Sequence, residues 1–358
     1  MPSLKEIKGR INSISSTLAI TSAMKMVAAA KLQKAQMAIQ NMLPYERRLH
    51  SMLIDLMGAM NISAAASEDG SVRGSGSAER GFDQSGDRLS LSNRHDLAGM
   101  DGAYSLMAQR EVRKVAIVAF ASNSSLCGAF NSNVIREATA VINEYRASGL
   151  GDADITVYSV GRKMAEAMKK LGFPSPADFT KMSDSPSYDA ASALAQELFD
   201  GFVSGRFDKV ELVYNHYKST SSQPTTRQTY LPLSLADATA DLQAGKIADS
   251  ASESDTNRGA EPVGAPVVRQ GSPTTEDLIV EPSKEALIAT LLPKVIRLRI
   301  FTTLLDSAAA EHAARTVAMQ LATDNGNDLL QELTLEYNKG RQQKITSEIL
   351  DLVGGSMQ

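Results

Sequence analysis

A heptad repeat of apolar residues near the N-terminus constrains the fold of this chain more than any other feature. Its a and d positions between residues 4 and 60 are all apolar except Thr21, Lys25 and Glu46. The frame consists of Leu4, Ile7, Ile11, Ile14, Leu18, Thr21, Lys25, Ala28, Leu32, Ala35, Ile39, Met42, Glu46, Leu49, Leu53, Leu56 and Met60. This spacing predicts one long helix with a coiled-coil seam.

Local signals refine the expected helix. Ser3, followed three residues later by Glu6, predicts an N-cap with a capping box. Pro44 predicts a kink or a local break, because proline removes one helical hydrogen bond and clashes with the preceding turn.

The stretch TSAMKMVAAAKLQKAQ at residues 21–36 is rich in alanine and lysine and contains neither proline nor glycine. Its alanines offer little area to bury against a core. We therefore expect another part of the molecule to come close to this helix, and the small residues to keep the resulting shaft narrow. The alanines are Ala23, Ala28, Ala29, Ala30 and Ala35.

A second helical pattern occupies residues 283–353, and the sequence contains no proline after Pro293. At 1.5 Å per residue the two tracts would reach on the order of 85 and 100 Å. Both lengths exceed the diameter of a small domain. We expect the two tracts to pair as an antiparallel coiled coil, with the rest of the chain joined to its base.

The middle of the chain follows a different pattern. Strand-like runs at residues 112–122, 154–161, 209–217 and 226–233 alternate with helical patterns at residues 129–147, 161–171 and 188–204. This alternation predicts a central Rossmann-like α/β domain with a mostly parallel sheet.

Five segments follow from these patterns. Residues 1–60 form the N-terminal shaft helix, 109–235 the α/β domain and 283–358 the C-terminal shaft helix. Residues 61–108 and 236–282 are expected to be flexible loop insertions, the second including a linker. Both are rich in small and polar residues, most clearly within 236–275.

Composition excludes several functional classes. The formal charge of −4, with 22% charged residues, gives no overall attraction to nucleic acid or anionic lipid. The single cysteine, Cys127, excludes an internal disulfide and a zinc site built from several thiolates. The sequence has no run of 18 apolar residues, and residues 1–12 lack the apolar core of a secretion signal. We expect a cytoplasmic protein, or one that reaches a membrane through partners.

The sequence offers no catalytic constellation. The loop at residues 121–133 lacks both glycine-rich phosphate-binding patterns, so we expect Gly128 to relieve a strained turn and Cys127 to be a buried structural residue. His50, His95, His216 and His312 have no metal-ligand spacing, and each is expected to be solvated or hydrogen-bonded. The acidic residues of TDNGNDLLQELTLEY are expected on a solvated helix face. From these residues we expect no catalytic constellation and no cofactor or metal site.

The two ends of the chain carry positive charge. In residues 1–50, lysine and arginine outnumber the two acids, Glu6 and Glu46, and the C-terminal tract adds NKGRQQKITSE. A slender, partly basic shaft with an exposed tip is suited to enter an acidic or polar-lined opening.

Three motifs carry a family resemblance. ITSAMKMVAAAKLQKAQ near the N-terminus, SLCGAFN after the first strand, and the run from EHAARTVAMQ to ITSEILDLVGG near the C-terminus together resemble the gamma subunit of rotary, proton-translocating ATP synthases. The resemblance covers both terminal helices and the α/β domain. It departs in the first loop, where many relatives have Asp-Arg-Gly before Leu-Cys-Gly, and a lone cysteine excludes the redox pair of chloroplast relatives.

The resemblance implies a central-stalk rotor that is not itself an enzyme and carries no catalytic residue. Such a rotor couples rotation of the membrane c-ring to conformational cycling of the catalytic beta subunits, for ATP synthesis and for regulation of ATPase activity and proton flow. The implied partners are the alpha and beta subunits, the epsilon subunit and the c-ring. The implied location is the cytoplasmic face of the bacterial inner membrane, with membrane contact only through the c-ring and no nucleic acid.

The same resemblance implies two groups of contact residues. Contacts with the alpha and beta subunits would fall on Met24, Lys25, Arg315, Arg341, Gln342, Thr346 and Glu348. An apolar tip turning in a hydrophobic sleeve would consist of Ile349, Leu350, Leu352 and Val353. Two alternatives remain open at this point: a nucleotide-dependent enzyme that uses the α/β domain, and a free coiled-coil scaffold.

Overall fold

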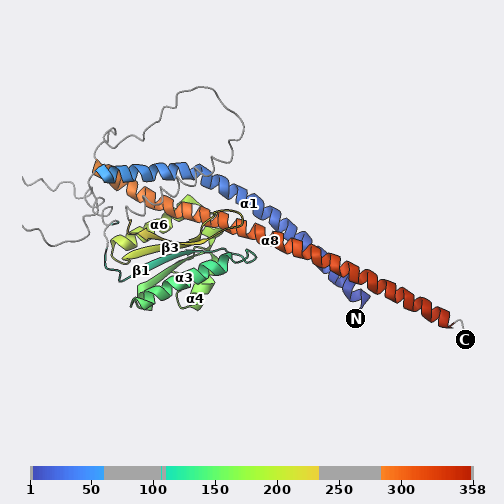
Figure 1. Cartoon of the computed structure of the whole chain (residues 1–358). Coiled ribbons are helices and arrows are strands. Elements are labelled where there is room, and N and C mark those ends of the chain that lie inside the picture. The colour runs from blue at the N-terminus through green and yellow to red at the C-terminus, as the bar shows by residue number, and fades with distance from the viewer. Residues whose placement is uncertain (1–2, 60–105, 107–109, 234–283, 356–358) are drawn as a thin grey trace, which may run out of the picture.

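Two long helices dominate the computed structural model, which describes residues 3–59, 106, 110–233 and 284–355. Helix α1 spans Leu4–Ala59 and helix α8 spans Lys284–Gly355. They run antiparallel, and α8 lies between α1 and the sheet at the wide end of the molecule (Figure 1). Both shaft helices and their pairing are therefore confirmed.

The heptad frame gives the correct buried face of α1. Every frame position from Leu4 to Leu53 is buried or half-buried, and none is exposed. Helix α1 is continuous across Pro44 and bends along its length in Figure 1, so the proline causes no break. Of the two hydrogen bonds of the predicted capping box, one is present: the Glu6 amide donates to Ser3 Oγ at 3.2 Å. The Glu6 carboxylate accepts instead from the Arg10 guanidinium at 3.1 Å.

The α/β body contains the predicted strands and helices, together with two short elements that the sequence did not reveal. Those two are the 3-10 helix η1 at Asp152–Asp154 and helix α5 at Thr180–Asp184. The strands are β1 Val115–Phe120, β2 Ile155–Val160, β3 Lys209–Asn215 and β4 Thr225–Leu231, and the helices are α3 Phe130–Ala147, α4 Arg162–Lys170 and α6 Tyr188–Val203.

The four strands form one mostly parallel sheet in the order β2-β1-β3-β4. Strand β1 pairs in parallel with β2 and β3, and β4 joins β3 antiparallel as a hairpin. One face packs against α3 and α4, and the other packs against α6 and the first part of α8. Because α8 supplies part of this core, the shaft and the body share one hydrophobic interior.

The two predicted loop insertions lie outside the described residues, apart from Leu106, which is fully buried. No helix in the described part of the chain is both long and apolar enough to cross a membrane.

Candidate functional site

The shaft keeps one register along its outer length. Thr323 Oγ1 donates to Thr21 Oγ1 at 3.1 Å. On the same side, Leu18 faces Gly326 and Leu4 faces Gly340, so the offset between the helices is constant from one end of this stretch to the other. An added Cβ would lie 2.6 Å from Leu18 Cδ2 at Gly326 and 3.1 Å from Leu4 Cδ2 at Gly340. Glycine thus allows the leucines of α1 to sit directly on the backbone of α8.

The alanines of α1 play a smaller part in this approach than we expected. Ala28 is buried and Ala35 is half-buried in the seam, but Ala23, Ala29 and Ala30 are exposed. Those three alanines therefore do not help the two helices to approach each other, because they lie off the heptad frame. They do keep the outside of the shaft narrow.

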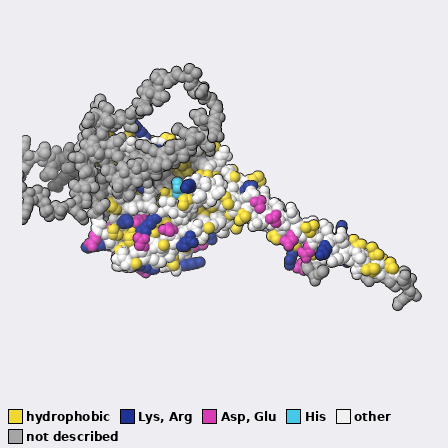
Figure 2. Space-filling view, viewed as in Figure 1, with side chains coloured by type: hydrophobic (Ala, Val, Ile, Leu, Met, Phe, Trp, Pro, Cys, Tyr) yellow, Lys and Arg dark blue, Asp and Glu magenta, His cyan; other side chains and the backbone are white. Residues whose placement is uncertain are grey.

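Helix α8 passes through three environments. Up to Met319 it is largely buried between α1 and the body. From residue 320 to Gly340 only a stripe facing α1 is half-buried, and every described side chain from Arg341 onward is exposed. The N-terminal end of α1, at Leu4, lies level with Gly340 of α8, so the last part of α8 projects alone (Figures 1 and 2).

The projecting end carries most of the predicted contact residues. Arg341, Gln342, Thr346 and Glu348 are all exposed, and Glu348 lies 3.8 Å from Lys344. The predicted apolar tip is also exposed: Ile349, Leu350, Leu352 and Val353 are 54%, 65%, 75% and 51% exposed. Figure 2 shows hydrophobic side chains gathered on this end. Water-facing residues of this kind mark an interaction site when they are contiguous.

A groove of about 270 Å³ lies where the shaft leaves the body. Its walls include Met24 and Lys31 from α1, Ser124 from the loop after β1, and Glu311, His312 and Arg315 from α8. The structure therefore brings together two predicted contact residues, Met24 and Arg315. Lys25 occupies a half-buried position in the seam.

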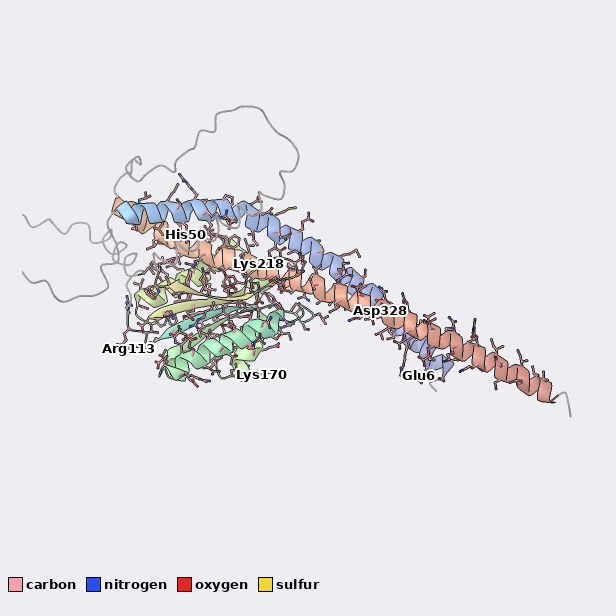
Figure 3. All side chains as sticks on the ribbon, in the orientation of Figure 1. Glu6, His50, Arg113, Lys170, Lys218 and Asp328 are labelled. Carbon is pink, nitrogen blue, oxygen red and sulfur yellow. The ribbon has the colours of Figure 1, made fainter. Side chains whose placement is uncertain are left out.

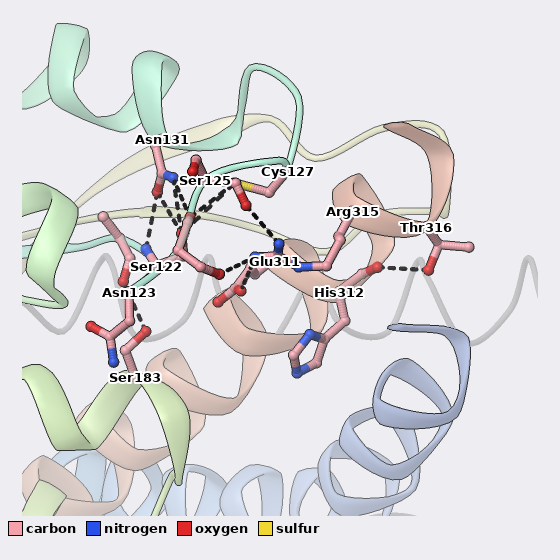
Figure 4. A network of polar contacts seen from close by, with 12 residues as sticks. Ser122, Asn123, Ser125, Cys127, Asn131, Ser183, Glu311, His312, Arg315 and Thr316 are labelled. Atoms are coloured by element: carbon pink, nitrogen blue, oxygen red, sulfur yellow. Dashed lines mark hydrogen bonds and ion pairs between the residues drawn. The ribbon is translucent and has the colours of Figure 1, made fainter. Parts of the chain in front are cut away.

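Arg315 is mostly engaged inside the chain. It is 9% exposed, and its guanidinium donates to the Ser125 carbonyl at 2.7 Å, to Ser124 Oγ at 2.8 Å and to Glu311 Oε1 at 2.7 Å (Figure 4). Asn131 holds the same loop from α3, because its Nδ2 donates to the Ser124 carbonyl at 3.1 Å. Arg315 thus ties α8 to the carboxyl end of β1, while its contact with a partner subunit stays a prediction.

Burial shifts the ionisation of the groove residues. Desolvation raises the pKa of Glu311, and the neighbouring Arg315 opposes this shift. Burial, with Lys31 and Arg315 adding repulsion, lowers the pKa of His312 to about 4. His312 is therefore neutral near pH 7, and its buried Nδ1 has no hydrogen-bond partner among the described residues.

The other histidines differ from one another. His216 Nδ1 lies 2.6 Å from Asp306 Oδ2, as a hydrogen-bonded histidine should. His50 is buried, its pKa falls to about 4 through burial and the nearby Arg299, and its Nε2 lacks a hydrogen bond within the described structure. The expectation of a solvated or hydrogen-bonded ring is wrong for His50, which is buried, whereas His312 is half-buried and lines the groove. His95 lies outside the described residues.

The predictions for Cys127, for Gly128 and for the acidic residues in the outer part of α8 are confirmed. Cys127 is buried, and Gly128 has a φ of +59°, which relieves the turn as expected. The acidic residues of TDNGNDLLQELTLEY, including Asp328 (Figure 3), are exposed. No group of three or more potential metal-ligating His, Cys, Asp or Glu side chains occurs in the part of the chain that the structure describes.

Sequence reasoning missed the roles of Gly326, Gly340 and Glu311. A signal for the glycines was present, because their separation equals that of Leu4 and Leu18 in the heptad frame. The sequence held no comparable signal for Glu311, whose partner Arg315 looked like an outward-facing charge.

Comparisons with known proteins find relatives of this chain in sequence and in structure. The family model described as ATP synthase matches residues 3–357. The ATP synthase gamma chain of Phocaeicola vulgatus is 47% identical over 357 residues, and that of Bacteroides thetaiotaomicron 45% over 358, each covering 100% of both chains. The rotor of the Euglena gracilis mitochondrial ATP synthase in rotational state 1 is similar in fold, with a TM-score of 0.51, 18% identity, and coverage of 96% of this chain and 98% of that one.

The similarity extends over whole chains and does not depend on one motif. Both shaft helices and the α/β body fall inside the region that the family model matches. The chain therefore belongs to the ATP synthase gamma chain family.

Proposed function

We propose that this chain is the central-stalk rotor of a proton-translocating ATP synthase. In this role it couples rotation of a membrane c-ring to the conformational cycle of the catalytic beta subunits, and it regulates ATPase activity and proton flow. Family membership supports the role, and the observation that carries it is the bare outer end of α8. A single helix with an exposed apolar tip, held out by a narrow two-helix shaft, is built to be received by other subunits.

The proposed partners are the alpha and beta subunits around the shaft, with the epsilon subunit and the c-ring at the body. The apolar tip would turn in a hydrophobic sleeve, while Arg341, Gln342, Thr346 and Glu348 would meet the alpha and beta subunits nearby. Met24, Lys25 and Arg315 would do so at the neck of the shaft. The five segments expected from the sequence, with boundaries at 60, 108, 235 and 282, are the domain division that we propose.

The chain would act through binding alone. Because the shaft is asymmetric, it presents a different surface to each beta subunit, and it thereby biases each catalytic site towards a different conformation. Exposed ion pairs are worth only about 0 to 1 kcal/mol, so contacts of this kind can form and break at each step. We place the chain as a peripheral protein on the cytoplasmic face of a bacterial inner membrane, attached through the c-ring.

Copurification tests the proposal. When the chain is coexpressed with the alpha and beta subunits of its own synthase, we expect a tag on beta to recover this chain at one copy per hexamer. If the tag recovers the alpha and beta subunits from the coexpressing cells without this chain, the proposal is contradicted. Equilibrium dialysis of the chain alone tests the enzyme alternative, which requires micromolar binding of ATP or NAD.

Variants of the tip locate the interaction. Leu350→Asp and Leu352→Asp place charges on side chains that are already exposed, so the free chain should fold normally while its recovery with the hexamer falls. Leu171→Asp is the matched control, because Leu171 is 45% exposed but lies on the body. Equal loss in all three variants would argue against a receiving sleeve.

A further inference from the structure

The β3–β4 hairpin reaches from the centre of the sheet to both shaft helices. Two of its residues, His216 and Tyr217, contact the single carboxylate of Asp306 on α8. His216 Nδ1 lies 2.6 Å from Asp306 Oδ2, and the Tyr217 amide donates to Asp306 Oδ1 at 2.9 Å. Both carboxylate oxygens are thus contacted by one turn, and the Asp306 side chain is only 17% exposed.

Tyr217 continues the contact to the second helix. Its ring packs against alanines of α8, including Ala309 and Ala310. Its hydroxyl accepts a hydrogen bond of 2.6 Å from Gln36 Nε2 on α1. One residue of the body therefore contacts α8 and α1 together, which is notable because α8 otherwise lies between α1 and the sheet.

The hairpin has a firm base. The His216 amide donates to the Pro224 carbonyl at 2.9 Å, and Thr225 Oγ1 donates to Asn215 Oδ1 at 2.7 Å across the two strands. Asn215 Nδ2 in turn donates to the Phe130 carbonyl at the start of α3 at 3.1 Å. A displacement of the hairpin would therefore have to disturb the sheet and α3.

We propose that this hairpin clamp, comprising His216, Tyr217, Asp306 and Gln36, fixes the angle of the shaft relative to the α/β body so that torque applied to one reaches the other. The proposal rests on the rotor function above. Apolar packing between α6 and α8 holds the two elements together, and the polar clamp adds directional contacts at a second place on α8. Hydrogen bonds weaken steeply when their geometry changes, and charge-assisted ones are the strongest.

Arg315 supplies a second fixed point. It joins α8 to the loop after β1, about two and a half helical turns beyond Asp306. Two polar attachments at different heights and from different loops resist both rotation and tilting of α8. His216, Tyr217, Asp306 and Gln36 are thus positioning residues.

The test compares ATP-driven proton pumping with ATP hydrolysis in vesicles that contain the complete synthase. In the double variant Asp306→Ala/Tyr217→Phe we expect hydrolysis to continue while the ratio of pumping to hydrolysis falls. Thr220→Ala, in the same hairpin but on an exposed residue, should keep the ratio of the original protein. An unchanged ratio in the double variant would overturn the proposal, whether both activities are kept or both fall by the same factor.

A cross-link provides the rescue. The variant His216→Cys/Asp306→Cys loses the contact between these two side chains and should show the low ratio of pumping to hydrolysis. A short thiol-reactive cross-linker should restore the ratio, whereas single-cysteine variants should not respond. A cross-link that stops rotation would show that body and shaft must move relative to each other, which contradicts the clamp. If the original chain fails to assemble with alpha and beta, the rotor function itself fails, and the two failures are thereby distinguished.

Discussion

The inner and outer halves of α8 belong to one uninterrupted helix but have opposite surroundings. The inner half contributes Ile288, Leu292, Ile296 and Ile300 to the main core, all at most 1% exposed. The outer half buries one stripe and then nothing, ending with Leu352 at 75% exposed. Apolar residues occur in both halves, so hydrophobicity alone does not tell which residues stabilise this chain and which wait for a partner.

The largest expected effect is on the free energy of unfolding, which should respond to a substitution in the inner half of α8 and not to one in the outer half. Ile300→Ala should lower the free energy of unfolding by about 2 to 5 kcal/mol, because it removes buried methyl groups and leaves a cavity. Leu352→Ala should change it by less than about 0.5 kcal/mol. Urea denaturation followed by circular dichroism measures both, and similar losses in the two variants would show that the outer end is also packed in the free chain.

The stability of the fold should depend on pH through His50, a buried residue of α1 that lies near Arg299 in the inner half of α8. His50 has a pKa of about 4 in the fold against 6.5 when unfolded, so the unfolded state binds a proton more readily. Protonation of the unfolded chain therefore costs the fold nothing above pH 6.5, and the free energy of unfolding falls as the pH drops towards 4, by about 3 kcal/mol in all. His50→Gln should flatten the unfolding free energy between pH 7 and pH 4.5. Parallel curves for variant and original chain would remove His50 as the cause.

The middle stretch of α8, where only the α1 side is covered, gives a smaller effect. Gly326→Ala should destabilise the chain by about 1 kcal/mol, since overpacking against Leu18 outweighs the gain in helix propensity. Gly340→Ala, with more space beside Leu4, should be neutral or slightly stabilising. In a Leu18→Ala background the Gly326 change should turn favourable, and thermal unfolding of the four variants checks this. A Gly326 penalty that persists without Leu18 would contradict the close contact.

The smallest effect concerns the hairpin clamp on the inner half. The hydrogen bond to Asp306 raises the pKa of His216, while partial burial and the nearby Lys218 oppose this shift. The stabilisation is therefore fully present below pH 6.5 and is lost as the pH rises through the raised pKa. Because His216 is half exposed, we expect less than about 1 kcal/mol. The protection factor of the Tyr217 amide, in which the base-catalysed rise of the intrinsic exchange rate is divided out, should fall over this pH range, and Asp306→Asn should remove that fall.

Much of the fold could be predicted from the sequence because helix and strand periods act locally. The heptad frame gave the buried face of α1, and the strand-like runs gave all four strands. Contacts between distant residues were not accessible in this way. Nothing beside His216 in the chain points to Asp306, and nothing beside Arg315 indicates that its guanidinium turns inward to the loop after β1 rather than out to a partner. Helix α5 was too short to give a periodic signal.

Rotation of a labelled body within the assembled complex tests the rotor account most directly. Lys170→Cys places a thiol on the exposed end of α4 (Figure 3), whereas Cys127, the chain's single natural cysteine, is 1% exposed. With the alpha and beta subunits fixed to a surface and a probe on that thiol, ATP should drive continuous rotation in one direction. Steady hydrolysis of ATP with a stationary probe would contradict the account.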